Sequence, residues 1–150
     1  MRWIRLKRSK IKVFGKRGKT LPKGFQEEHT ALLHSLLTND IKGMKPFTLS
    51  YNLWLKQNGS PIQDFLVYKL EDAYILDTSA DPKWLIQEFE RSKLSLRVRF
   101  EDLTESYGYI FVFGEDSRDW IEKTFGQVPE EVVLKIPQVY RHTCRAWSIK

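Results

Sequence analysis

The clearest pattern in the chain is a pair of alternating segments joined by a tight turn. From Phe47 to Lys56 apolar and polar residues alternate, which is the two-residue period of a half-buried strand. A second alternating run covers residues 62–70, and Gln57-Asn58-Gly59-Ser60 separates the two runs. Because Asn and Gly both accept positive φ, this turn favours a tight connection. The pattern predicts a β-hairpin over residues 47–70.

The second strand of this hairpin carries a carboxylate among apolar residues. Asp64 shares one side of the strand with Ile62, Leu66, Tyr68 and Leu70. A charged carboxylate on such a side is costly unless it is paired, protonated or aimed into a cavity. Asp64 is therefore expected to point inward and is a candidate site residue. The structural alternative is an aspartate that accepts backbone N–H bonds, or pairs with Lys69 or with an arginine of the strand beginning at Leu94.

Similar patterns predict the elements around the hairpin. Further strands are expected at residues 8–15, 74–77, 94–102 and 109–113, and in a short tail from Val132. Helices are expected at residues 26–39, from Pro82 with Asp81 as its N-cap, and from Asp116 or Ser117 to a stop at Gly126. The order is βαβββαββα with a β tail. The fold class is α+β, with a mainly antiparallel sheet and about three helices.

Some local features carry their own expectations. Residues 8–15 are typical of an edge strand, where lysines discourage pairing between molecules. Asn39 and Asp40 are expected to cap the C-terminal end of the first helix. His29 and His34 lie five positions apart on that helix, about 140° around its axis, so they are expected in solvent and not on a shared metal. We expect no metal site.

Composition limits the class of protein. A chain of 150 residues with 41% hydrophobic residues can form one domain with a real core. Cys144 is the only cysteine, which excludes a disulfide within the chain and suits the reducing cytoplasm, although its role is open. No apolar run approaches the roughly 20 residues that cross a bilayer. A cytoplasmic protein without a membrane partner is expected.

Several of these motifs, taken in order, point to a known family. Thr38-Asn39-Asp40, Tyr51, the Gly59 turn and the run from Asp64 to Tyr68 resemble the first domain of the glycine-cleavage T-protein, an aminomethyltransferase. The same domain occurs in non-enzymatic folate-binding relatives, including proteins tied to iron-sulfur cluster maintenance and tRNA modification. The resemblance covers roughly Arg8 to Gly126.

The resemblance implies a binding site for tetrahydrofolate. Asp64 would lie beside the folate and would be catalytic if the protein is an enzyme, while Tyr51, Leu66 and Tyr68 would line the slot. The structural alternative for both tyrosines is core packing. The family's enzymes usually carry two adjacent acids at this point, whereas this chain has Gln63 before Asp64.

The match does not continue past Gly126. The sequence after it matches neither the ligand-gripping second part of the T-protein nor the cysteine loop of the iron-sulfur branch. Together these observations imply a single folate-binding-like domain over residues 1–150, with a divergent tail at 127–150. Such a domain would be non-catalytic and linked to one-carbon metabolism or iron-sulfur cluster assembly. A homodimer or a partner chain would supply the missing part of the site, and a split aminomethyltransferase is an alternative.

Positive charge is concentrated near the N-terminus. Residues 1–23 contain ten of the 25 Lys and Arg residues and no acidic residue, while the whole chain carries a net charge of +6. Residues 1–25 therefore form a basic arm and loop. Such an arm attracts RNA phosphates or the carboxylates of a polyglutamylated folate. An RNA-binding or assembly adaptor that uses this arm and the Arg97 and Arg99 face is the alternative function.

Overall fold

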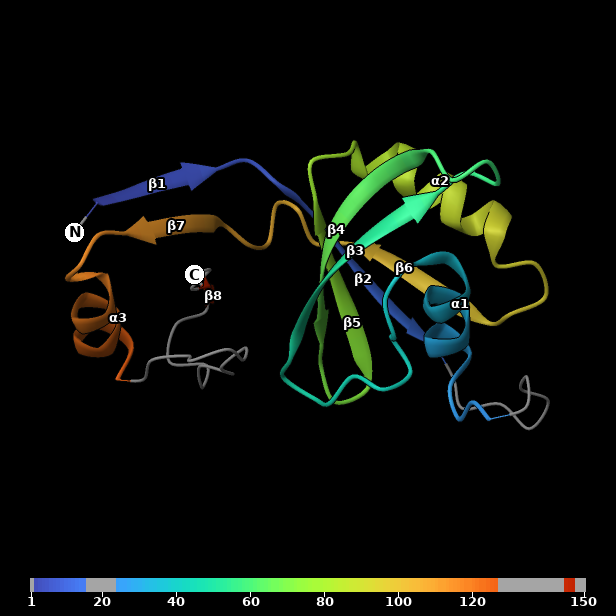
Figure 1. Cartoon of the computed structure of the whole chain (residues 1–150), viewed down its shortest axis with the longest axis horizontal. Coiled ribbons are helices and arrows are strands. Elements are labelled where there is room, and N and C mark those ends of the chain that lie inside the picture. The colour runs from blue at the N-terminus through green and yellow to red at the C-terminus, as the bar shows by residue number, and fades with distance from the viewer. Residues whose placement is uncertain (1, 16–23, 127–144, 148–150) are drawn as a thin grey trace.

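The computed structural model describes residues 2–15, 24–126 and 145–147. These residues form an α+β fold with two mainly antiparallel sheets and three helices (Figure 1). The elements in chain order are β1 (Arg2–Leu6), β2 (Ser9–Gly15), α1 (Glu28–Leu36), β3 (Leu49–Leu55), β4 (Pro61–Lys69), β5 (Ala73–Thr78), α2 (Pro82–Ser92), β6 (Val98–Asp102), β7 (Tyr109–Phe113), α3 (Ser117–Phe125) and β8 (Arg145–Trp147). The predicted class is confirmed.

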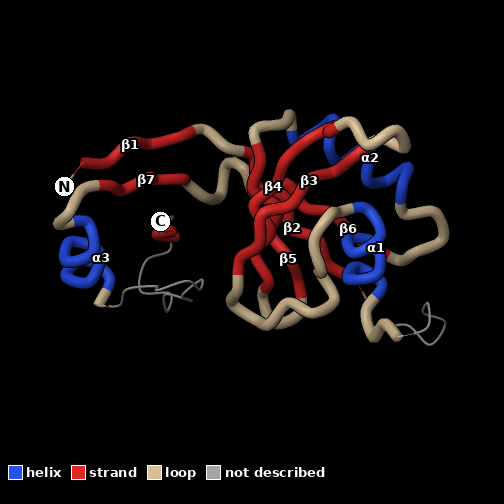
Figure 2. Tube along the Cα trace, in the orientation of Figure 1, coloured by secondary structure: helices blue, strands red, loops and turns tan. Residues whose placement is uncertain are grey.

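The two sheets differ in size and role. The larger sheet has the order β3-β4-β5-β2-β6 and all its pairs are antiparallel. The smaller sheet has the order β1-β7-β8, and its β7–β8 pair is parallel. Loop segments between β1 and β2 and between β6 and β7 join the two sheets (Figure 2). The smaller sheet therefore extends from the body that contains the main core.

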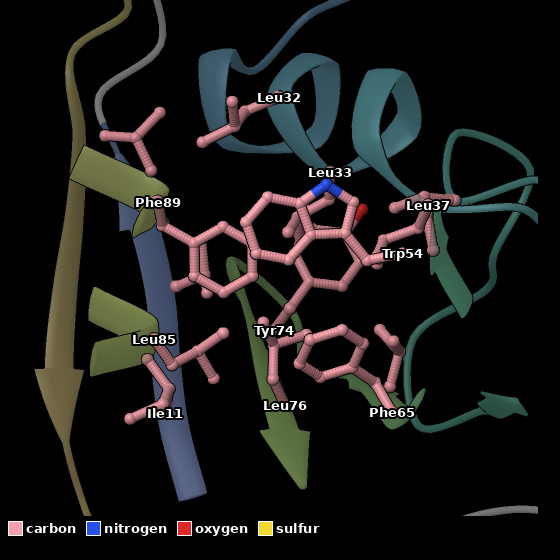
Figure 3. Packing of buried hydrophobic residues seen from close by; sticks show 14 residues of the cluster. Ile11, Leu32, Leu33, Leu37, Trp54, Phe65, Tyr74, Leu76, Leu85 and Phe89 are labelled. Atoms are coloured by element: carbon pink, nitrogen blue, oxygen red, sulfur yellow. The ribbon is translucent and has the colours of Figure 1, made fainter. Parts of the chain in front are cut away.

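The main core lies between the larger sheet and the helices α1 and α2. Trp54 of β3 stacks on Phe89 of α2 with ring centroids 5.1 Å apart, and Phe89 also stacks on Phe100 of β6 at 5.5 Å. Leu32 and Leu33 enter from α1, as Figure 3 shows. Aromatic pairs of this kind add to the apolar area that they bury. This packing fixes the helix-covered face of the sheet.

The predicted hairpin is present, but its strands turn the opposite side toward the main core. Gly59 adopts φ 84 in the turn, and Leu53 pairs with Asp64. The residues buried against the helix layer are Asn52, Trp54, Phe65 and Val67. The expectation that Asp64 points inward is wrong, because the larger rings of Trp54 and Phe65 fill that layer and Asp64 lies half-buried on the other face.

Strand β2 is an interior strand, and the expectation of an edge strand is wrong. It pairs with β5 on one side and with β6 on the other. Ile11 and Val13 are fully buried in the main core, while Lys10 lies on the opposite face and is only 4% exposed. The lysines of β2 therefore do not protect an edge.

Two elements are shorter than the sequence predicts. The strand expected from Leu94 begins only at Val98, because Leu94 sits in a turn after α2 with φ 50 and is 87% exposed. Helix α1 ends at Leu36, so Asn39 does not cap it. The backbone N–H of Asn39 instead donates to Oδ1 of Asn52 at 2.9 Å, which ties the segment after the helix to β3.

Other local predictions are confirmed. Asp81 caps α2 by accepting the backbone N–H of Trp84 at 2.9 Å, and Gly126 ends α3 with φ 72. Strand β1 was not predicted, because all of its residues are exposed and show no alternation. The tail from Val132, including Cys144, lies outside the described residues apart from 145–147. No described helix has the length and apolarity that a bilayer span requires.

His29 is buried at 2% exposure, so the expectation that it lies in solvent is wrong. Its Nε2 atom lies 3.3 Å from Oε2 of Glu27, and its ring meets the Tyr74 ring edge-on at 5.7 Å between centroids. His34 remains partly exposed. Burial lowers the pKa of His29, more than the nearby Glu27 carboxylate raises it. The folded protein therefore holds His29 neutral under conditions where an unfolded chain would protonate it.

This burial predicts acid sensitivity. Since the pKa of His29 is about 6.5 in the unfolded chain and lower in the folded one, only the unfolded state takes up this proton just below about pH 6.5. The free energy of unfolding should therefore fall as the pH drops through this window and should level off above it. Urea titrations across the window should show a shallower slope for His29→Leu. Equal slopes in the native protein and the variant would contradict the assignment.

Candidate functional site

The face of the larger sheet opposite the helices carries a row of candidate site residues. Tyr51 pairs with Leu66, Leu66 pairs with Asp77, and Asp77 pairs with Lys10. Directly paired residues of antiparallel strands point to the same side. Strands β3, β4, β5 and β2 therefore place these four residues in one row across the sheet, next to Asp64.

Asp64 is held by two side chains at one end of this row. The Tyr51 hydroxyl donates to Oδ2 of Asp64 at 3.1 Å, and Nε2 of Gln63 donates to Oδ1 at 3.2 Å. The pKa of Tyr51 is raised by desolvation, and further by the hydrogen bond and charge of Asp64. The phenol therefore stays protonated at neutral pH and acts as the donor. This leaves Asp64 as a partly exposed acceptor with a fixed orientation.

Gln63, which stands where the family's enzymes usually have an acid, anchors Asp64 to the next strand. Its Nε2 also lies 2.9 Å from Oγ1 of Thr78 and 3.2 Å from Oγ of Ser79. Thr78 in turn donates its hydroxyl to the backbone carbonyl of Asp64 at 2.7 Å. Gln63 thus has a positioning role that a carboxylate could not fill, because a carboxylate donates no hydrogen bond when ionised.

The structural alternatives for Asp64 can be compared directly. Lys69 lies on the opposite face and donates to the Tyr74 hydroxyl at 3.2 Å, so it is not the partner of Asp64. Arg97 precedes β6 and forms an ion pair with Glu28 at 3.2 Å. Arg99, in β6, is not paired with Asp64 among the described contacts. Within the described chain, neither of the charge partners expected for Asp64 is used.

The sequence-predicted lining residues do not lie at equal depth. The Tyr51 side chain is 53% exposed, and Leu66 is half-buried beside it. Tyr68 is fully buried and packs in a second cluster with Ile75 and Tyr109. The structure therefore brings Tyr51, Asp64 and Leu66 together at the surface, while Tyr68, farther along the same face of β4, is covered by the second cluster.

The sequence did not reveal a buried ion cluster at the other end of the row. The Arg8 guanidinium donates to the Asp77 carboxylate, and Nζ of Lys10 lies 3.8 Å from its Oδ2 atom. Arg8 and Lys10 also lie over the Tyr109 ring, at 5.7 and 5.8 Å from its centroid. Asp77 directly follows the continuous apolar run from Ala73 to Leu76, and a carboxylate at the end of such a run was the available signal. Its partners come from β2 and the preceding loop, which the sequence does not connect to β5.

Burial dominates the protonation behaviour of this cluster. Desolvation raises the pKa of Asp77 more than Arg8 and Lys10 lower it. Desolvation also lowers the pKa of Lys10, against the attraction of Asp77. The charged form of Asp77 therefore depends on Arg8 and Lys10 staying beside it. In the described residues, no group of three or more His, Cys, Asp or Glu side chains is placed to hold a metal ion.

Comparison with known proteins agrees with the resemblance. Residues 24–141 match the model of the GCVT N-terminal domain, so the match extends beyond Gly126, where the resemblance was expected to end. An uncharacterised protein of Aquifex aeolicus is 59% identical over 128 residues, which are 84% of this chain and 86% of that protein. An aminomethyltransferase of Listeria welshimeri is 30% identical over 112 residues, 71% of this chain, and one of Oceanobacillus iheyensis is 26% identical over 108 residues, 68% of this chain.

The fold agrees as well. The crystal structure of glycine cleavage system aminomethyltransferase T from Bartonella henselae superposes with a TM-score of 0.66 at 13% identity, over 91% of this chain and 36% of that one. The match spans only 29% of the length of each of the two aminomethyltransferases. Since the family model covers most of the chain, the protein belongs to the GCVT N-terminal domain family.

Proposed function

We propose that this domain binds a reduced folate on the face that carries Asp64 and Tyr51, and that it does not catalyse group transfer by itself. The observation that carries the proposal is the Tyr51–Asp64 hydrogen bond, which holds a carboxylate ready on a partly open surface. A carboxylate accepts the paired N–H donors of a flat aminopyrimidine edge, such as that of tetrahydrofolate. Membership of the GCVT N-terminal domain family supports the same ligand class.

The residues present fit this ligand. A carboxylate has about four acceptor positions, and Tyr51 and Gln63 occupy two of them on Asp64. The exposed ring of Tyr51 offers a face for stacking on the pterin, and Leu66 adds an apolar neighbour. Asp64 would orient the pterin, and Tyr51 would fix both the carboxylate and the ring plane. Tyr68 is buried on the same face of β4 and would support Leu66 through the second cluster.

The same surface argues against catalysis by this domain alone. Asp64 has an amide neighbour, Gln63, and no adjacent acid, so the second acid common in the family's enzymes is replaced by a positioning group. An open surface also does not exclude water from a reacting centre. Folate binding would connect the protein to one-carbon metabolism or to iron-sulfur cluster maintenance. Aminomethyl transfer would need groups supplied by a partner chain.

A partner is also proposed for structural reasons. The smaller sheet exposes Trp3 at 60% on one face, and Ile4 at 49% and Phe113 at 39% on the other. Strand β1 is also an edge of its sheet, with one side open to pairing. We propose that a second copy of this chain, or a partner chain, pairs with this edge and completes the folate site.

Replacing Asp64 by Asn should weaken tetrahydrofolate binding by about 10- to 100-fold, because a hydrogen bond to a charged group contributes about 1.5–3 kcal/mol. Anaerobic calorimetric titration measures the change. Tyr51→Phe keeps the ring and loses the hydroxyl, so a smaller loss is expected. Asp119→Asn, an exposed acid on α3, is the matched control and should bind as the native protein does. Native affinity in Asp64→Asn would overturn the site.

The RNA-adaptor alternative is an outcome of the same experiment. Binding dominated by phosphate contacts should weaken steeply between low and physiological salt, whereas pterin recognition by Asp64 should largely persist. A folded protein that takes up RNA in this salt-dependent way, and shows no saturable folate binding, would favour the adaptor.

A further inference from the structure

A cleft lies where the loops that join the two sheets meet. It has a volume of about 380 Å³, and its lining includes Arg5, Lys7, Arg8, Lys10, Thr104 and Glu105. The lining residues come from the segment around the β1–β2 loop and from the loop between β6 and β7. Four of the lining side chains are cationic and one is acidic.

Two of these cations are available to a ligand. Arg8 and Lys10 share the buried carboxylate of Asp77. Arg5 and Lys7 are exposed, and neither has an ion pair with a carboxylate in the part of the chain that the structure describes. The cleft therefore has a surplus of positive charge, which attracts an anion.

The backbone holds the cleft in shape. The N–H of Lys10 donates to Oγ1 of Thr104 at 3.1 Å, and the N–H of Leu103 donates to the carbonyl of Lys10 at 2.8 Å. Arg5 pairs with Ile110 across the β1–β7 ladder. The two loops are thus joined above and below the cleft, so a ligand would not have to order them.

The row of paired residues that begins at Tyr51 leads toward the cleft, with Asp77 and Lys10 buried within it. The row from Tyr51 through Leu66 and Asp77 ends at Lys10, which lines the cleft. Strands β3 and β2 lie three strand spacings apart, roughly 14 Å in total. The charge of Asp64 also contributes to the raised pKa of Arg8. An elongated ligand with hydrogen-bond donors at one end and anions at the other could therefore reach both.

We infer that the cleft binds the anionic tail of the ligand whose head lies on Asp64, and that this tail is a chain of γ-linked glutamates. The inference rests on the proposed function. Carboxylates spaced along a flexible chain match the separate cations Arg5 and Lys7. A cleft of about 380 Å³ accommodates a few such groups.

The test compares tetrahydrofolate carrying one glutamate with tetrahydrofolate carrying four, in the native protein and in the double variant Arg5→Gln/Lys7→Gln. Exposed ion pairs contribute about 0.2–1 kcal/mol each, so the longer tail should tighten native binding about three- to tenfold, less at high salt. The double variant should lose this gain and keep its affinity for the monoglutamate. Lys83→Gln/Lys123→Gln, on α2 and α3, is the control and should keep the gain.

Each outcome separates the two claims. If the monoglutamate binds but the longer tail adds nothing, or adds equally in the Arg5/Lys7 variant, the cleft inference is wrong and the proposed function stands. If neither protein binds the monoglutamate, the proposed function fails and takes the inference with it. Displacement of the tail by inorganic triphosphate at far lower concentration than by free tetra-γ-glutamate would assign the cleft to phosphate and overturn the carboxylate assignment.

Discussion

Phe89→Ala is expected to lower the free energy of unfolding by about 3–5 kcal/mol, the range for removing a buried aromatic ring. Phe89 is fully buried and contacts rings from three strands: Trp54 at 5.1 Å, Phe100 at 5.5 Å and Phe65 at 6.1 Å between centroids. Because these neighbours are held by the sheet, they cannot collapse into the space that the ring leaves. The loss therefore includes a cavity as well as apolar burial.

Urea denaturation of the two proteins measures this difference. Phe113→Ala is the matched control, because Phe113 lies on β7 at 39% exposure and outside the main core. Its removal should cost about 1 kcal/mol or less. Equal losses in the two variants would show that the cluster between α2 and the sheet is not the centre of the fold.

Arg8→Met is expected to destabilise the protein by about 3 kcal/mol at neutral pH, because it leaves the charge of Asp77 buried without its hydrogen-bonded partner. Asp77 is 1% exposed, and Lys10 alone remains, at 3.8 Å from Oδ2. The exposed pair between Arg91 and Glu88, at 2.7 Å, gives the control. Arg91→Met should cost less than about 1 kcal/mol.

The loss in Arg8→Met should depend on pH in a defined direction. The pKa of Asp77 is already raised in the folded protein, and removal of Arg8 raises it further. As the pH falls through this raised pKa, the folded variant takes up a proton that the unfolded chain does not, and it regains stability relative to the native protein. Chemical denaturation at several pH values measures this convergence. Arg8→Met/Asp77→Asn should recover most of the loss at neutral pH, and a double variant as unstable as Arg8→Met would contradict the buried-charge account.

Local rules predicted much of the fold because the signals are local. The Asn58-Gly59 turn needs positive φ, Asp81 caps a helix three residues before the N–H that it accepts, and Gly126 supplies a left-handed stop. Alternation placed most strands. It could not say which side of β3 meets the helices, because Tyr51 and Trp54 are large residues on opposite sides and the choice depends on α1 and α2.

In the candidate site too, the local contact was predictable from the sequence and the long-range contact was not. Tyr51 and Asp64 are diagonal neighbours on the two strands of one hairpin, so the turn and the resemblance together locate them. The pairing of Arg8 with Asp77 joins residues 69 positions apart, and no short-range pattern records it. The exposed strand β1 was missed for a related reason, since its partner β7 lies near the other end of the chain.

The most direct test of the central claim is to map tetrahydrofolate onto the protein by ¹H–¹⁵N NMR titration under anaerobic conditions. The account predicts saturable shift changes that centre on the amides of Tyr51, Asp64 and Leu66 and disappear in Asp64→Asn. Saturable changes confined to the opposite, helix-covered side, or the absence of any change in the folded protein, would contradict it.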